Sequence, residues 1–164
     1  MDNIVLLSGN SNINLASKIA DKLNINMNEG NIPTMFSNTE WHPQIIDNLR
    51  GKDVFIIQSG CINKEKGLSV NDIIFETLIL VDSCRRSAAS TVNIIMPNYP
   101  YARGDKKDEP RAPIPAKLVA NLLVSVKIDR LVSVDLHATQ IQGFIDIPFD
   151  NLYSVNLVIE CFNK

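Results

Sequence analysis

Cysteine is scarce in this sequence, and no spacing pairs the cysteines that are present. Cys61, Cys84 and Cys161 are the three cysteines among 164 residues, and no CxxC motif occurs. An odd number of widely spaced cysteines argues against a disulfide framework and against a cysteine zinc site. We therefore expect three reduced thiols in a cytoplasmic protein.

The sequence also lacks a long apolar run near its start and a large excess of either charge. The first apolar run covers only Ile4–Leu7, which is too short for a signal peptide or a membrane span. The net charge is −2, whereas a dedicated nucleic-acid binder usually carries a broad basic face. We expect a soluble protein that binds neither membranes nor nucleic acids, so any anion site must be local.

Three common nucleotide-binding and hydrolase signatures are missing. The chain contains no GxxxxGK[ST] loop, no GxGxxG and no GxSxG. What it has is the composition of one globular domain, with 45% apolar and 21% charged residues. A site for a polyphosphate must therefore be built from other residues.

Short apolar runs alternate with segments of helical periodicity. Helices are predicted after Ser11 or Asn12, over Ile73–Arg86, and after Pro113. Short, continuously apolar strands are typical of a parallel sheet covered on both faces. The sequence therefore predicts a three-layer α/β domain with a mainly parallel sheet, whose central strands are Val5–Ser8, Val54–Ser59, Val92–Met96 and Leu131–Val134.

The remaining segments carry weaker patterns. Ile25–Phe36 should contain a loop and an edge strand, and Phe144–Asn151 an irregular or edge element. Leu152–Lys164 should begin a further helix.

Two unusual segments each follow a predicted strand directly. Tyr99–Pro113 is a charged stretch without apolar periodicity, and Asp135–Gly143 reads DLHATQIQG. In open parallel sheets, ligands bind beyond the carboxyl ends of the strands. Both segments are therefore expected on the binding edge of the sheet.

The first of these segments is rich in cations that could meet a triphosphate. Arginine offers a fork of donors and lysine a point charge. The alternative is a solvated charged loop, neutralised by Asp105, Asp108 and Glu109, and the charges alone favour it slightly. The position after a strand favours a site. The side chains concerned are Arg103, Asp105, Lys106, Lys107 and Arg111.

The second segment contains a carboxylate and an imidazole two residues apart. Asp135 and His137 lie at a strand end, so both can point into one cleft. Together they could bind Mg²⁺, and the histidine could contact a phosphate. A lone DxH is also compatible with a structural hydrogen bond.

A third candidate lies in the sequence FSNTEW. Phe36, Asn38 and Glu40 alternate after the expected edge strand, so they could stack on a base and hydrogen-bond to it. Without other information, an ordinary turn is the better explanation of these residues.

Taken together, several stretches resemble ribose-phosphate pyrophosphokinase, also called phosphoribosyl pyrophosphate synthetase. They are LLSGNSNINLASKIADKL, FSNTE, LRGKDVFIIQSGC, PYARGDKKDEPRAPIPAKLVANLL and VDLHATQIQGFIDIPFDNLY, which together span essentially the whole chain. The family uses Mg²⁺ and transfers diphosphate from ATP to ribose 5-phosphate, giving phosphoribosyl pyrophosphate and AMP. The resemblance implies a phosphoribosyltransferase-like fold.

The resemblance also implies roles for individual residues. Arg103 and His137 would be the catalytic residues, and His137 and Asp135 would bind Mg²⁺. ATP would be bound by Phe36, Asn38 and Glu40, which reach adenine from a neighbouring subunit, and by Arg103, Asp105 and Lys106.

A regulatory site for phosphate or ADP is implied as well. Family members assemble as hexamers built from dimers, so a homo-oligomer with shared sites is expected. The residues implied are Arg50, Lys107, Arg111, Gln142, Asp150 and Asn151.

The resemblance covers only the N-terminal, ATP-binding half of the family's two-domain subunit. Residues 1–164 are thus expected to form a single domain that lacks the ribose 5-phosphate domain and is inactive alone. Gly104 replaces the family's usual glutamine, and Glu109 stands where a cation is common. A non-catalytic regulatory subunit of a synthetase is therefore the alternative function.

Overall fold

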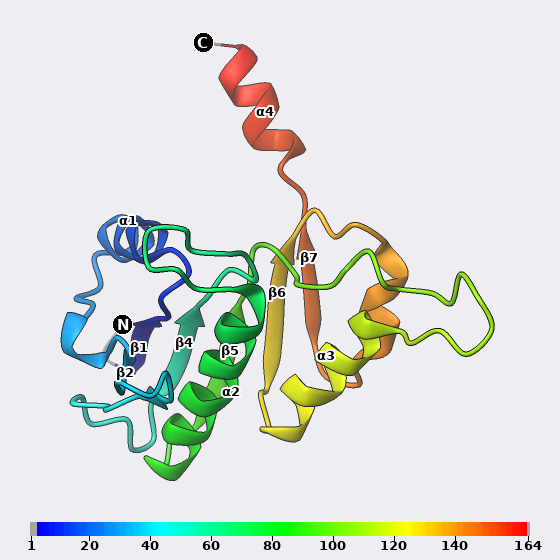
Figure 1. Cartoon of the computed structure of the whole chain (residues 1–164). Coiled ribbons are helices and arrows are strands. Elements are labelled where there is room, and N and C mark those ends of the chain that lie inside the picture. Colours follow the sequence, from blue (N-terminus) through cyan, green and yellow to red (C-terminus); the bar gives the residue numbers. More distant parts are fainter. Residues whose placement is uncertain (1–2, 164) are drawn as a thin grey trace.

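The structure is a computed structural model that describes residues 3–163. Its centre is a sheet of five parallel strands in the order β1-β4-β5-β6-β7 (Figure 1). The strands are β1 (Ile4–Ser8), β4 (Asp53–Ile57), β5 (Thr91–Ile95), β6 (Arg130–Val134) and β7 (Phe149–Leu152).

The predicted α/β class and parallel sheet are confirmed, with one correction to the strand order. β1 pairs only with β4, so within the described residues it lies at the edge and is not central. The predicted edge element at the end of Phe144–Asn151 is β7, which closes the opposite edge. Because every pair is parallel, all five strands end at the same edge of the sheet.

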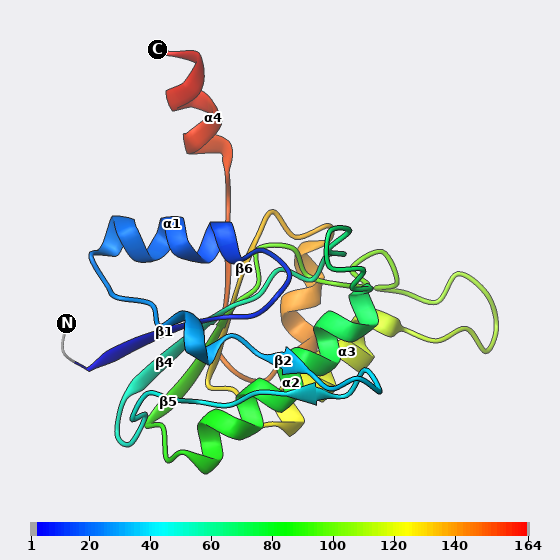
Figure 2. The same cartoon turned by 60° about the vertical axis from the view of Figure 1, so that its left-hand side comes forward.

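Helices lie on both faces of the sheet. α2 (Val70–Arg86), α3 (Pro115–Ser125) and the short 3-10 helix η2 (Thr139–Phe144) cover one face, and α1 (Ile13–Leu23) lies on the other (Figure 2). α4 (Val155–Phe162) extends away from the sheet in both views (Figures 1 and 2). Within residues 3–163, no helix has the length and apolar character needed to cross a membrane.

Local signals in the sequence set the helix starts. The side chain of Asn12 accepts a hydrogen bond from the backbone N–H of Leu15, which caps α1. Ser69 and Asp72 form a reciprocal capping box at the start of α2. α3 begins with Pro115 at its first position, where proline has no N–H bond to lose.

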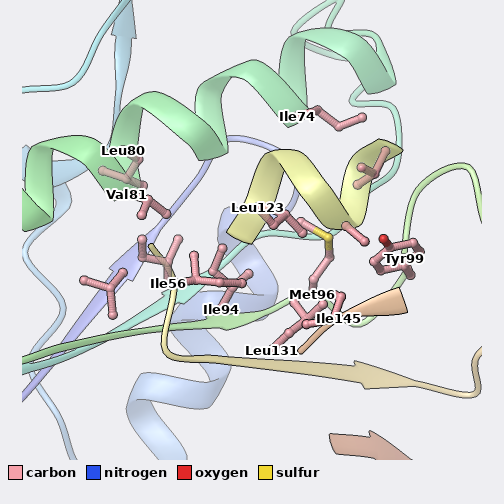
Figure 3. Close-up of a cluster of buried hydrophobic side chains, with 14 of the residues drawn as sticks. Ile56, Ile74, Leu80, Val81, Ile94, Met96, Tyr99, Leu123, Leu131 and Ile145 are labelled. Atoms are coloured by element: carbon pink, nitrogen blue, oxygen red, sulfur yellow. The ribbon is translucent and has the colours of Figure 1, made fainter. Parts of the chain in front are cut away.

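Most of the apolar core lies between the sheet and the α2–α3 layer (Figure 3). Ile56, Ile94 and Leu131 come from three adjacent strands and meet Leu80 and Leu123 from the two helices. A smaller cluster under α1 contains Leu6, Ala16, Ala20 and Ile57. The sheet is therefore packed on both faces, as its continuously apolar strands require.

The segment between α1 and β4 forms a separate small hairpin. After the 3-10 helix η1 (Glu29–Asn31), β2 (Thr34–Met35) and β3 (Trp41–His42) pair antiparallel. The expected strand is thus present but belongs to this hairpin instead of the main sheet. The indole N–H of Trp41 donates to the carbonyl of Asp72 and so fixes the hairpin to α2.

A buried carboxylate joins three parts of the fold. Glu76 of α2 is 0% exposed, and one of its oxygens accepts from the backbone N–H and the side-chain amide of Asn10, at 2.9 and 2.6 Å. Its other oxygen accepts from the Gln58 amide at 2.6 Å. Burial raises the pKa of the Glu76 carboxyl, while these hydrogen bonds and the charge of Lys66 oppose the rise.

The raised pKa predicts a specific pH dependence of stability. The folded state holds the Glu76 proton more tightly than the unfolded state. This group therefore stabilises the fold most below its ordinary pKa of 4.5 and contributes less as pH rises through the raised value. We expect Glu76→Gln to remove that dependence, so that the wild-type free energy of unfolding declines relative to the variant above pH 4.5.

Urea unfolding between pH 4 and pH 8 measures this difference (roughly 1.4 kcal/mol per pH unit at most). Asp82→Asn is the control, since Asp82 is a surface carboxylate of the same helix that pairs with Arg86. Parallel stability profiles for wild type and Glu76→Gln would contradict the prediction.

Candidate functional site

A cavity of about 580 Å³ opens at the edge where the parallel strands end. Its walls come from the segments that follow β4, β5 and β6 and from the first residue of α2. Figure 1 shows the long loop after β5 leaving this edge and extending beyond α3. The cavity is therefore formed by loop residues that follow three neighbouring strands.

Two neighbouring loops are clamped together to make the floor of this cavity. The N–H of Gly60 donates to the carbonyl of Asn98 at 2.8 Å, and the side-chain amide of Asn98 donates to the carbonyl of Gly60 at 2.9 Å. A Cβ on Gly60 would lie 2.4 Å from Cδ of Pro100 and 2.6 Å from the Asn98 oxygen. Only glycine fits this approach without displacing the neighbouring loop.

Arg103 lines the cavity on the loop after β5. Its exposed guanidinium has no hydrogen-bond or ion-pair partner among residues 3–163. The preceding turn is fixed: Tyr101 has a left-handed backbone (φ 57°) and its hydroxyl donates to Asn71 at 2.5 Å. Gly104 is held by backbone hydrogen bonds to Tyr101 and Ala116. An unpaired cation is thus presented from an anchored turn.

The segment after β6 supplies the facing wall. Asp135 has a left-handed backbone (φ 47°), and its N–H donates to the carbonyl of Leu152. One oxygen of its carboxylate accepts from the N–H of Ser154 at 3.2 Å. Both Asp135 and His137 line the cavity with Arg103. The structure therefore brings together the two segments that the sequence placed on the binding edge.

Other residues assigned to ATP do not line this cavity. The carboxylate of Asp105 accepts from Gln140 of η2 at 2.7 Å, and Lys106 lies 3.7 Å from Asp108 on the surface. The hairpin turn carries the remaining three residues away from the cavity, all of them exposed: Phe36, Asn38 and Glu40. Within this turn, the ring of Phe36 lies 4.6 Å from that of His42.

The residues assigned to a regulatory site are dispersed within a single chain. Arg50 precedes β4 at the amino-terminal edge of the sheet, whereas Lys107 and Arg111 lie in the long loop at the opposite edge. Gln142 belongs to η2 and donates to the carbonyl of Thr139.

The last two residues of the regulatory set lie on β7. Asp150 pairs with Arg130 at 2.6 Å. The side-chain oxygen of Asn151 accepts from the N–H of Leu136 at 3.1 Å. Asp150 therefore contacts the start of β6, and Asn151 contacts the loop that follows β6. One chain does not assemble this set into a single site.

A metal ion would find few protein ligands here. Residues 3–163 hold no group of three or more His, Cys, Asp or Glu side chains arranged for a metal. Asp135 and His137 together offer an oxygen and a nitrogen from one side of the cavity. A divalent cation would need further oxygen atoms from a ligand.

Sequence reasoning missed the residues that hold the site together. Gly60 and Asn98 carry no charge, and nothing in their local sequence predicts the clamp. Glu76 could have been found, since it shares the buried face of the predicted helix with Ile73 and Leu80. A carboxylate at such a position signals a buried polar network.

The fold and the cavity define a parallel α/β domain with a cavity at the carboxyl edge of its sheet, and comparison with known proteins specifies the family. Residues 4–126 match the family model described as the N-terminal domain of ribose phosphate pyrophosphokinase. The chain belongs to this family.

One solved structure is similar over almost the entire chain. It is phosphoribosylpyrophosphate synthetase from Mycobacterium smegmatis, with a TM-score of 0.89 and 37% sequence identity. The match covers 98% of this chain and 52% of the synthetase chain. The residues described here thus span about half the length of that relative.

The loop clamp predicts a cost for any side chain at position 60. We expect Gly60→Ala to lower the free energy of unfolding by about 1–3 kcal/mol, because the added methyl group overpacks the contact with Asn98 and Pro100. Urea unfolding measures the change. Gly143→Ala is the matched control, since a Cβ there meets no atom within 4 Å. Equal stability of the two variants would contradict the proposed clamp.

Proposed function

We propose that this chain is the ATP-binding half of a ribose-phosphate pyrophosphokinase. The complete activity would transfer the β,γ-diphosphoryl group of ATP to ribose 5-phosphate. The observation that carries the proposal is the convergence of Arg103, Asp135 and His137 on one cavity at the carboxyl edge of the sheet. Family membership supports the reaction class.

The charges of the cavity suit a polyphosphate. Arg103 has no acidic partner within residues 3–163, so its donors are available for the phosphate oxygens. The carboxylate of Asp105 would otherwise compete, but it accepts from Gln140. The cavity volume of about 580 Å³ lies within the range of small-molecule sites.

Mg²⁺ fits the same wall. We propose that Asp135 and His137 hold it together with oxygen atoms of the nucleotide, because two protein ligands plus phosphates are typical for this ion. When bound, the ion neutralises phosphate charge and orients the chain of phosphates. The metal ion would then hold the side chain of His137 beside the phosphates. The carboxylate of Asp135 is held by the hydrogen bond that it accepts from the N–H of Ser154.

Phosphoryl transfer depends on positioning both reactants and stabilising charge between them. We propose that residues 1–164 form one nucleotide-binding domain, and that a further domain presents ribose 5-phosphate. Assembly into a homo-oligomer would bring Phe36, Asn38 and Glu40 of one subunit to the adenine of another, and would gather the regulatory residues.

Removing the unpaired cation tests the nucleotide site. We expect Arg103→Ala to weaken binding of Mg²⁺-ATP by about 10-fold to 100-fold, as for a lost charge-assisted hydrogen bond. Isothermal titration calorimetry measures the affinity. Arg86→Ala is the control, because Arg86 is a surface arginine that pairs with Asp82 on α2. Unchanged affinity in Arg103→Ala would exclude this residue from the site.

The imidazole should act mainly through the metal ion. We expect His137→Ala to reduce the gain in ATP affinity that Mg²⁺ provides, while affinity measured in EDTA changes less. Titrations with and without Mg²⁺ separate the two effects. Equal losses under both conditions would assign His137 to the phosphates alone.

Turnover measurements separate the proposed enzyme half from the alternative regulatory subunit. We expect residues 1–164 to bind ATP yet release no AMP in the presence of ribose 5-phosphate. Activity restored by the complementary half of a synthetase would support the enzyme assignment. A stable complex with a complete synthetase, without nucleotide binding by this chain, would support the regulatory subunit. Robust turnover by this chain alone would contradict the two-domain proposal.

A further inference from the structure

A second cavity lies at the start of α1, beside the buried residues Asn10, Gln58 and Glu76, here called the Glu76 cluster. Its volume is about 450 Å³. One wall is the start of α1, residues 11–14, and the other is the loop between β4 and α2, residues 62–66. None of these residues lines the candidate nucleotide cavity. The proposed function therefore leaves this second cavity unexplained.

The buried network fixes both walls of this cavity. On one wall, the N–H of Ser11 donates to the side-chain oxygen of Gln58 at 3.0 Å. On the other, the amide of Asn63 donates to the carbonyl of Asn10 at 2.8 Å, and the ammonium of Lys66 donates to its side-chain oxygen. Both Gln58 and Asn10 are bonded to Glu76. The two walls are thus anchored to Asn10, Gln58 and Glu76, which are all buried.

Ser11 supplies an observation that points to a ligand. The residue is 8% exposed, lines the cavity, and its hydroxyl has no hydrogen-bond partner within the described chain. Leaving a buried hydroxyl unpaired destabilises a fold. A polar group entering the cavity would satisfy it.

The neighbouring donors indicate the charge of that group. The first N–H groups of a helix have no partners inside the helix. Asn12 caps the N–H of Leu15, but within residues 3–163 no hydrogen bond satisfies the N–H of Ile13 or Asn14. These donors and the positive end of the helix dipole favour an anion.

Side-chain charges on the facing loop are mixed but favour the same ligand. Lys64 is exposed and has no ion-pair partner in the described structure, and Lys66 is shared with Asn10 and Glu76. The carboxylate of Glu65 also lines the cavity and opposes an anion. The exposed ammonium of Lys64 is therefore the cation left free to meet a ligand.

We propose that this cavity, formed by Ser11–Asn14 and Ile62–Lys66, binds a phosphate group, either free or carried by a small phosphomonoester. The backbone N–H groups of Ile13 and Asn14, the hydroxyl of Ser11 and the ammonium of Lys64 hold the oxygens. The site does not depend on nucleotide binding at Arg103 and His137.

NMR titration of the ¹⁵N-labelled chain tests the proposal residue by residue. Inorganic phosphate and glycerol 3-phosphate are the two probes, and tighter binding of the second indicates that the site takes an ester. We expect saturable shifts of the backbone amides of Ser11, Ile13 and Asn14. Shifts confined to other regions, or none at these three amides, would overturn the proposal.

Three variants are expected to change the affinity for phosphate in different directions. Lys64→Ala should weaken phosphate binding about fivefold, as for a screened surface charge, whereas Glu65→Gln should strengthen it. Ser11→Ala should weaken binding while leaving the stability of the free protein equal or higher, because it removes an unpaired buried hydroxyl. Lys22→Ala, at the other end of α1, is the control. Equal affinities in all four variants would refute the assignment of these side chains.

Discussion

The arrangement of the site depends on one constraint, which is that the loops leaving adjacent parallel strands are bonded to each other. Gly60 and Asn98 exchange two hydrogen bonds across the ends of β4 and β5. The N–H of Val134 and the hydroxyl of Ser133 both bond to the carbonyl of Pro97, which joins β5 to β6. The three loops therefore begin from fixed positions, and those after β5 and β6 carry Arg103, Asp135 and His137 to one cavity.

Rigidity at the strand ends explains how polar groups can be held without a recognised phosphate loop. Tyr101 and Asp135 both adopt left-handed backbone conformations within the cavity wall, which cost free energy for residues other than glycine. A hydrogen bond accompanies each turn. The hydroxyl of Tyr101 donates to the side chain of Asn71, and the N–H of Ser154 donates to the carboxylate of Asp135. These turns lie within two residues of Arg103 and His137, which line the same cavity.

Sequence patterns predicted the parts of the fold that repeat. The strands around Ile56, Ile94 and Leu131 were predictable because continuous apolar runs of that length suit a doubly covered sheet. The capping residue Asn12 marked the start of α1 for a local reason, whereas the cap at Ser69 starts α2 at Val70, three residues before the predicted start at Ile73. The edge position of β1 was not predictable, since an apolar run such as Ile4–Leu7 does not reveal how many partners a strand has. In β1, one face packs under α1 through Leu6.

The site was predictable only as far as chain order and topology determine it. Arg103 and His137 follow different strands, so their common edge was inferred from the parallel sheet. By contrast, the pairing of Asp105 with Gln140 depends on how the long loop meets η2, which no local pattern encodes. The contacts of Glu76 with Asn10 and Gln58 span 66 and 18 residues and likewise arise only in the folded chain.

The Glu76 cluster links the two cavities physically. Gln58 directly precedes the Ser59–Gly60 segment that reaches the first cavity, while its side chain binds Glu76 and Ser11. A Cβ on Gly9 would lie within 2.4 Å of the Gln58 amide, so the side chain has little room to move. One buried carboxylate therefore sets the loop after β1, the loop after β4 and the first half of α2 at once. The two proposed anion sites therefore share one hydrogen-bonded centre, which holds the loops that carry their donors.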